Sequence, residues 1–193
     1  MTDSRRIGIL SVGNVLMGDD GIGPYVLKIL EARYEFPANV VAHDLGTPGL
    51  GITSFFADYD AVILIDAVSA KGQPGDVRLY RKDKLVRVPI PQRVSPHDPA
   101  LVEALLFAEF SGKCPQEVLL VGVVPENVEL GCEITESVRA AVVPAISAIL
   151  AELTRLGIEP RLRECALRPS IWWQENVSSN CPEEDDYVPG YSG

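Results

Sequence analysis

The fold of this chain is decided by residues 7–23, which read Ile-Gly-Ile-Leu-Ser-Val-Gly-Asn-Val-Leu-Met-Gly-Asp-Asp-Gly-Ile-Gly. The opening residues, up to Val12, form an apolar run that is typical of a buried strand. A glycine-rich bend follows, and apolar residues then recur on one face of a predicted helix: Ile22, Val26, Ile29 and Leu30. The stretch therefore predicts a strand, a tight bend and a helix in direct succession.

The bend itself is acidic. Bends of this kind often bind phosphate, because the amides at a helix N-terminus attract anions. Here Asp19 and Asp20 occupy that anion position, and the order of the glycines does not match a dinucleotide-binding fingerprint. The bend therefore favours a cation or a polar group. Because aspartate is also a preferred helix N-cap, a purely structural role for this pair stays open.

The rest of the chain alternates apolar runs with helical patterns. We expect further strands at 40–44, 61–65, 76–80 and 117–124, and helices at 50–56, 99–111 and 135–156. The polar run 76–80 suits a sheet edge, residues 81–96 suggest a crossing loop, and Pro144 should kink the last helix. This alternation predicts a single α/β domain with an open, mostly parallel, twisted sheet of about five strands and helices on both faces.

Residues 160–193 differ from everything before them. They are rich in proline and acidic residues and show no helical or strand periodicity. We therefore divide the chain into an α/β domain, residues 1–159, and an acidic, proline-rich C-terminal tail that we expect to be loosely ordered. The alternative is that Trp172 and Trp173 dock on the domain or on a partner.

Composition limits the possible partners. The formal net charge of −10 argues against nucleic acid, whose binding depends on basic residues. We see no apolar run approaching the roughly 18 residues that a membrane span needs, so we expect no membrane partner. The apolar N-terminal run is too short for a signal peptide, which predicts a cytoplasmic protein. The four cysteines show no Cys-x-x-Cys spacing and are expected to be buried or incidental thiols.

Acidic residues follow three consecutive predicted strands. Asp19 and Asp20 follow the first strand, Asp44 the second and Asp66 the third. Because the carboxyl ends of parallel strands meet at one edge of a sheet, where ligands bind, these carboxylates should gather there and require a cation. His97 precedes a predicted helix that could start at the same edge.

These residues suggest a metal site with open positions. Asp20, Asp66 and His97 would offer carboxylate oxygens and one imidazole nitrogen, a donor set suited to zinc, nickel or a similar divalent ion. Simpler roles stay open, since Asp66 could make a turn and His97 could be a solvated loop residue. His43 neighbours Asp44 on a strand and points to the opposite face, so we treat it as structural.

The motifs follow one another in order over residues 7–157: Gly13-Asn14-x-Leu16-x-x-Asp19-Asp20-Gly21-x-Gly23, then Asp44-x-Gly46-Thr47-x-Gly49, Ile65-Asp66-Ala67, and His97 ahead of a helix. This arrangement resembles the hydrogenase maturation endopeptidases, and the first motif is its most specific part. Members of that family remove a C-terminal peptide from the precursor of the nickel-iron hydrogenase large subunit after nickel insertion.

The resemblance implies a role for each matched residue. Asp20, Asp66 and His97 would form the catalytic and nickel-contacting set, while Asp44, Gly46 and Thr47 would match the segment linked to substrate recognition. Nickel would arrive on the precursor, and zinc or a cadmium-like divalent ion could replace it. The implied activity is that of a nickel-dependent endopeptidase of aspartic or metal-assisted type, in which the metal or a carboxylate activates the attacking water.

Two other functions stay open at this point. The first is a non-catalytic nickel-sensing or metal-delivery module with the same acidic edge. The second is a nucleotide-binding α/β domain, in which Asp44 would hold a ribose, although the acidic bend argues against it. The sequence contains no Gly-x-Ser-x-Gly or His-Glu-x-x-His motif that would favour another hydrolase.

Overall fold

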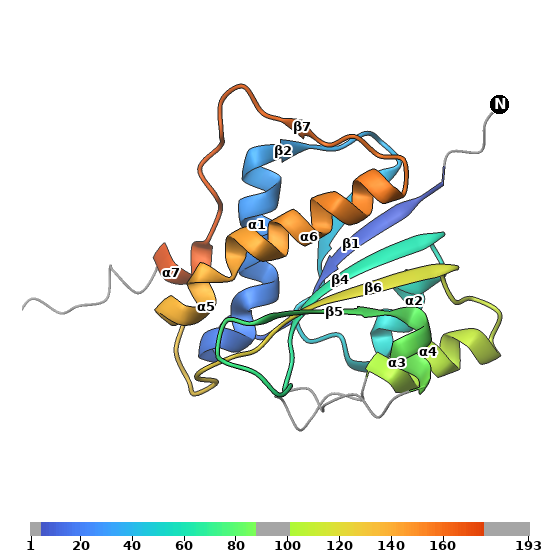
Figure 1. Ribbon diagram of the computed structural model, residues 1–193, viewed down its shortest axis with the longest axis horizontal. Helices are drawn as coiled ribbons and strands as arrows, with labels where there is room; N and C mark the ends of the chain where they lie inside the picture. The colour runs from blue at the N-terminus through green and yellow to red at the C-terminus, as the bar shows by residue number, and fades with distance from the viewer. Residues whose placement is uncertain (1–4, 88–100, 176–193) are drawn as a thin grey trace, which may run out of the picture.

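A computed structural model describes residues 5–87 and 101–175 and contains one central five-stranded sheet (Figure 1). The strand order is β3-β1-β4-β6-β5, and every pair is parallel except β5 with β6. The strands are β1 Ile7–Ser11, β3 Val40–Asp44, β4 Ala61–Ala67, β5 Val77–Arg81 and β6 Glu117–Val123. The predicted open, mostly parallel α/β sheet is confirmed, and β5 lies at the edge as its polar sequence indicated.

Helices cover both faces of this sheet (Figure 1). One face carries α1 Ile22–Arg33, α5 Glu136–Ala140, α6 Val142–Arg155 and α7 Trp172–Glu175. The other carries α2 Ile52–Phe56, α3 Lys82–Arg87 and α4 Leu101–Phe110, and two single-turn 3-10 helices, η1 Gly18–Gly21 and η2 Gly49–Gly51, precede α1 and α2. Each layer of helices encloses its own apolar core against the sheet.

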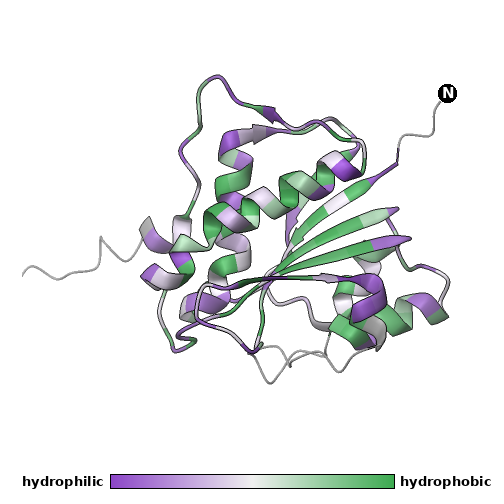
Figure 2. Ribbon diagram, in the orientation of Figure 1, coloured by the Kyte–Doolittle hydropathy of each residue, from purple (hydrophilic) through white to green (hydrophobic). Residues whose placement is uncertain are grey.

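The central strands β1, β4 and β6 are hydrophobic along most of their length (Figure 2). Every residue of β4 is buried, and its side chains alternate between the two cores: Ile63 and Ile65 face α1 and α6, while Val62 and Leu64 face α2 and α4. Parallel strands covered on both faces are expected to show such continuous apolar runs. By this alternation, Asp66 lies on the α2 and α4 face of the sheet.

Two predicted elements need correction. Part of the expected crossing loop 81–96 is the helix α3, which buries Leu85 completely, and residues 88–100 lie outside the described residues. The single kinked helix at 135–156 is in fact two helices that separate at Ala141. The proline ring at Pro144 crowds the carbonyl group of Ala140, four residues earlier, so the break falls before the proline, which then sits in the first turn of α6.

The combined stretch Glu136–Arg155 also corrects our reading of the composition. It is 20 residues long, and an 18-residue window within it has a mean hydropathy of 1.5, which is enough to cross a membrane by length and composition alone. In the fold, α6 uses its apolar side chains to face the sheet, and Ala145, Ile149 and Leu153 are fully buried in the core. A core helix therefore accounts for this hydropathy.

The segment after α6 packs against the domain, which makes our expectation of a loosely ordered tail wrong for residues 161–175. Strand β7, Arg161–Leu162, pairs antiparallel with β2, Tyr34–Glu35, and the chain then runs along α1 to α7 (Figure 1). Trp173 is only 3% exposed and joins the core, whereas Trp172 is 56% exposed. We call residues 161–175 the C-terminal strap. Residues 176–193 lie outside the described residues.

Candidate active site

The bend after β1 depends on Gly13. Its φ of 146° lies in a region that favours glycine, and a Cβ there would lie 2.0 Å from the backbone oxygen of Asp20. The Gly13 amide donates to the carbonyl of Gly46 over 2.9 Å, which ties the bend to the loop after β3. The Asn14 amide donates to Asp20 Oδ2 over 2.8 Å. The Asp20 carboxylate is therefore held by a backbone amide of the same bend.

Gly23 brings the acidic bend against β4. A Cβ on Gly23 would lie 2.3 Å from the Val12 oxygen and 2.6 Å from the Ile65 oxygen, so only glycine allows α1 to begin so close to both strands. The turn η1 consequently lies against β4, the strand that carries Asp66. Asp20 and Asp66 are both buried charged residues at the carboxyl edge of the sheet, which is where open α/β sheets bind their ligands.

Asp66 also lines a narrow pocket on the α2 and α4 side of the sheet. Among the described residues, its other walls are formed by glycine and apolar side chains: Val12, Pro48, Gly49, Ile52, Leu64, Leu101 and Leu120. A carboxylate beside apolar side chains is poorly screened by solvent, which strengthens its interaction with a cation. The arrangement can hold a positively charged group or a polarised water at this edge.

Asp19 has a different role from its neighbour. It is fully buried, and its carboxylate accepts hydrogen bonds from the amides of Glu126, Asn127 and Thr135 over 2.9, 2.9 and 2.7 Å. The Thr135 hydroxyl donates to the same carboxylate. Asp19 therefore anchors the loop between β6 and α5. Sequence reasoning missed these partners, since no local pattern links Asp19 to residues so far along the chain.

Asp44 organises the loop after β3. Its Oδ1 accepts hydrogen bonds from the Ser11 hydroxyl and from the Gly46 amide, each over 3.1 Å. Gly46 has a φ of 57°, and Thr47 is exposed beside it. Asp44 and Thr47 thus lie on the surface near the bend, where a substrate segment could reach them. Their part in substrate recognition stays a prediction.

The four carboxylates predicted to gather at the edge are therefore divided in their roles. Asp20 and Asp66 are buried there. Asp19 holds the loop between β6 and α5, which is distant in sequence, and Asp44 is exposed. His97 lies outside the described residues. Among the residues that the structure describes, no group of three potential metal ligands comes together, so the predicted three-ligand set stays a prediction. The ring of His43 packs near those of Phe55 and Tyr59.

Comparison with known proteins decides the family. The model of a family described as hydrogenase maturation protease matches residues 24–152 of this chain. The chain belongs to the hydrogenase maturation protease family. Its relatives include the hydrogenase 2 maturation protease of Escherichia coli, which is 38% identical over 160 residues, or 82% of this chain and 97% of the relative. Another is the hydrogenase expression/formation protein HoxM of Azotobacter vinelandii, which is 36% identical over 82% of this chain and 77% of its own length.

Solved structures agree with this assignment. The hydrogenase maturating endopeptidase HybD from E. coli superposes with a TM-score of 0.74 at 35% identity, covering 82% of this chain and 98% of that protein. A hydrogenase 2 maturation peptidase from a Thaumarchaeota archaeon gives a TM-score of 0.60 at 33% identity, covering 78% and 99%. Membership of this maturation protease family makes the chain a peptide-bond hydrolase and implies that a hydrogenase large-subunit precursor is its substrate.

Proposed function

We propose that this protein removes the C-terminal extension of a nickel-iron hydrogenase large-subunit precursor once nickel has been inserted, and that it recognises the nickel carried by the substrate. The observation that carries the proposal is that Asp20 and Asp66 are each buried at the carboxyl edge of the sheet. Family membership supplies the reaction class, and this edge supplies carboxylates suited to polarise water or to contact a cation.

The proposed reaction needs one carboxylate that acts as a general base. This carboxylate orients a water molecule against the scissile carbonyl group, accepts its proton as the water attacks, and returns that proton to the leaving nitrogen as the C–N bond breaks. The apolar side chains beside Asp66 screen its charge less than water does, which strengthens this interaction. The Asn14 amide keeps the Asp20 carboxylate in place over 2.8 Å while the substrate binds. Asp44, Gly46 and Thr47 contact the substrate beside the bend.

Nickel enters this scheme as cargo of the precursor. Asp20 and Asp66 would offer oxygen donors to it, and His97 an imidazole nitrogen, a combination that suits nickel and also zinc or a cadmium-like ion. Because such a set leaves coordination positions for the ligands of the precursor, it would distinguish a loaded precursor from an empty one. The reaction is expected to take place in the cytoplasm.

The test is intact-mass spectrometry of precursors incubated with the protein. A nickel-loaded large-subunit precursor should lose a C-terminal peptide, and the same precursor without nickel should keep its mass. Equal cleavage of both would overturn nickel recognition and leave the protease activity. Failure to cleave any of several precursors, together with nickel binding by the protein alone, would favour the non-catalytic metal-delivery module.

A further inference from the structure

The loop between β6 and α5 is hydrogen-bonded to the acidic bend and lies beside it. The Gly131 amide donates to the Leu16 carbonyl over 2.9 Å, and the Gly18 amide donates to the Gly131 carbonyl over 2.8 Å. These bonds place the tip of the loop beside the turn that carries Asp20. The loop lies at the lower left of the fold, between β6 and α5 (Figure 1).

Two leucines are presented to solvent at this junction. Leu130 is 86% exposed and Leu16 is 49% exposed. An exposed leucine is ordinary on a mobile loop, but this loop is fixed by the buried Asp19 carboxylate and by the bridge of Met17 with Gly131. The fold therefore holds an apolar contact point in a defined place next to the candidate active site.

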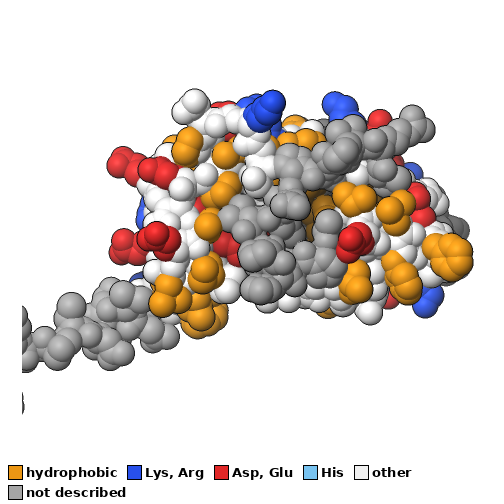
Figure 3. Space-filling view, turned by 90° about the horizontal axis from the view of Figure 1, so that it is seen from below, with side chains coloured by type: hydrophobic (Ala, Val, Ile, Leu, Met, Phe, Trp, Pro, Cys, Tyr) orange, Lys and Arg blue, Asp and Glu red, His pale blue; other side chains and the backbone are white. Residues whose placement is uncertain are grey.

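The loop that carries Leu130 is rich in acidic residues, and the next basic residue along the chain is Arg139, which donates to the Ile134 carbonyl. Residues 125–136 contain no lysine or arginine. They contain four exposed glutamates, and none of these forms an ion pair within 5–87 and 101–175: Glu126, Glu129, Glu133 and Glu136. Seen from below, acidic and hydrophobic side chains lie together at the left-hand end of the molecule (Figure 3). We call these four glutamates with Leu16 and Leu130 the acidic loop surface.

We propose that the acidic loop surface docks a segment of the precursor in which an apolar side chain is flanked by lysine or arginine; this inference rests on the proposed function. The charge of the surface attracts such a segment and steers it toward the bend. The same charge repels nucleic acid and anionic lipid. It also disfavours a second copy of this chain, whose net charge is −10.

The test compares surface variants that leave the bend untouched. For Glu129→Lys/Glu133→Lys, the KM for the precursor should rise about tenfold at low salt with kcat unchanged, and the difference should shrink at about 0.5 M salt, where exposed charges are screened. For Leu130→Ser, the KM should rise about fivefold at either salt concentration, because an apolar contact does not depend on screening.

Matched controls carry the same changes elsewhere. Glu159→Lys/Glu164→Lys makes the same change of net charge near β7, and Phe110→Ser removes an apolar side chain that is 93% exposed at the end of α4. Both should keep the wild-type KM within about twofold. If the controls raise the KM as much as the loop variants do, or if the loop variants match wild type, the proposal is wrong.

A binding measurement separates this proposal from the proposed function. Affinity for the precursor is measured by surface plasmon resonance in the Asp66→Asn background, with and without the loop changes. If wild type leaves the precursor uncut while binding still depends on the loop, the proposed function fails and the docking surface stands. If the loop changes leave binding intact, the docking surface fails. A dimer of this chain that Leu130→Ser dissociates would assign the surface to a second copy instead.

Discussion

The adjacent residues Asp19 and Asp20 have different roles because their side chains point in different directions. Asp20 turns toward the Asn14 amide inside the bend, while Asp19 turns toward the loop between β6 and α5. Without Asp19, the loop amides that donate to its carboxylate would lose a charged hydrogen-bond partner. At this site, charge-assisted hydrogen bonds stabilise the wall beside the active site.

The Asp19→Asn variant should loosen this wall. An amide can replace only part of the acceptor capacity, so at least one loop N–H loses its bond and the free energy of unfolding should fall by about 2 kcal/mol. Urea denaturation measures the loss, and hydrogen–deuterium exchange should quicken at residues 126–135. Glu133→Gln, an exposed change on the same loop, serves as the control. Unchanged exchange in Asp19→Asn would show that its carboxylate does not hold the loop.

The Asp66→Asn variant should separate chemistry from folding. The side chain keeps its shape and stays buried, but it can no longer act as a base or as an anionic donor, so we expect kcat to fall at least about a hundredfold. The midpoint of thermal unfolding should stay close to that of wild type by circular dichroism. Asp44→Asn, at an exposed position, should mainly raise the KM. Wild-type kcat in Asp66→Asn would remove Asp66 from the reaction.

The sequence placed Asp20 and Asp66 at the same edge for a sound reason, which is that parallel strands align their carboxyl ends. In the structure, the register of β1 with β4 pairs Ser11 with Ile65, so the carboxyl ends of the two strands lie at the same edge of the sheet. The role of Asp19 could not be predicted, because it depends on a loop more than a hundred residues later whose path no local pattern encodes.

At the scale of elements, local patterns predicted what local forces determine. Strands β1, β4 and β6 are apolar runs, and α1 is apolar and buried along most of its length. The C-terminal strap was not predictable in this way, since β2 and β7 are only two residues each and exist because they pair with each other. The sequence indicates that the tryptophan pair could dock on the domain, but only the structure shows which of the two side chains is buried.

The strap gives a prediction with an internal control. Trp173→Ala should lower the free energy of unfolding by about 3–4 kcal/mol, because it removes a core side chain that the surrounding helices cannot replace. Trp172→Ala, the exposed neighbour, should change it by less than about 1 kcal/mol. Urea unfolding of both variants measures the difference. Equal losses would mean that the strap is held by its backbone pairing and not by the buried ring.

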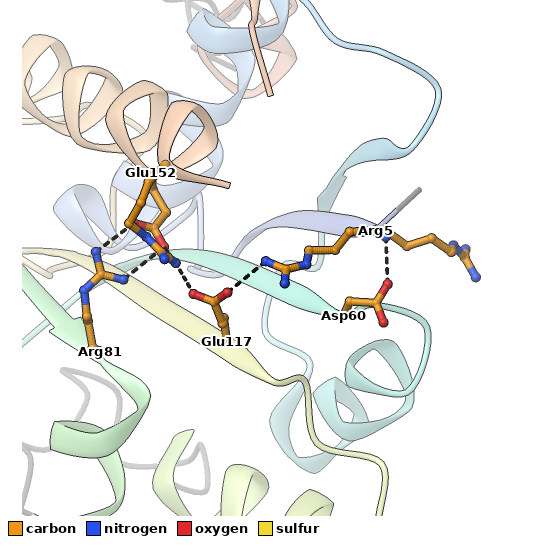
Figure 4. A network of polar contacts seen from close by, with 7 residues as sticks. Arg5, Asp60, Arg81, Glu117 and Glu152 are labelled. Atoms are coloured by element: carbon orange, nitrogen blue, oxygen red, sulfur yellow. Dashed lines mark hydrogen bonds and ion pairs between the residues drawn. The ribbon is translucent and has the colours of Figure 1, made fainter. Parts of the chain in front are cut away.

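At the scale of the whole molecule, the two ends of the sheet are specialised. The carboxyl end carries the candidate active site, and the amino end carries a network of charged side chains that connects β5, β6, α6 and the N-terminal segment (Figure 4). Arg81 binds both oxygens of Glu152 over 3.0 and 2.8 Å, Arg155 bridges Glu152 and Glu117, and Arg5 binds Glu117 over 2.9 Å. The network fastens helix α6 and the edge strand to the sheet far from the chemistry.

The buried carboxylate of Glu152 makes this end sensitive to acid. Burial opposes its ionisation, but hydrogen bonds from Arg155 and Arg81 more than offset that effect and lower its pKa to about 2. In the unfolded chain the same group has a pKa near 4.5. Because the folded pKa is the lower one, its contribution to stability is fully present above about pH 4.5 and is lost as the pH falls toward about 2.

The Glu152→Gln variant should therefore remove part of the acid sensitivity of the fold. At pH 7 it should unfold about 2 kcal/mol more easily, which allows for the solvent that screens the half-exposed arginines, and its melting temperature should fall by about 4–8 °C. Below about pH 3 the difference from wild type should narrow, because wild type then loses the same charge. Thermal melts across this pH range, with the exposed Glu159→Gln as the control, make the measurement. A difference that stays constant with pH would mean that Glu152 acts through packing, and the stability of the amino end would then not depend on its ionisation.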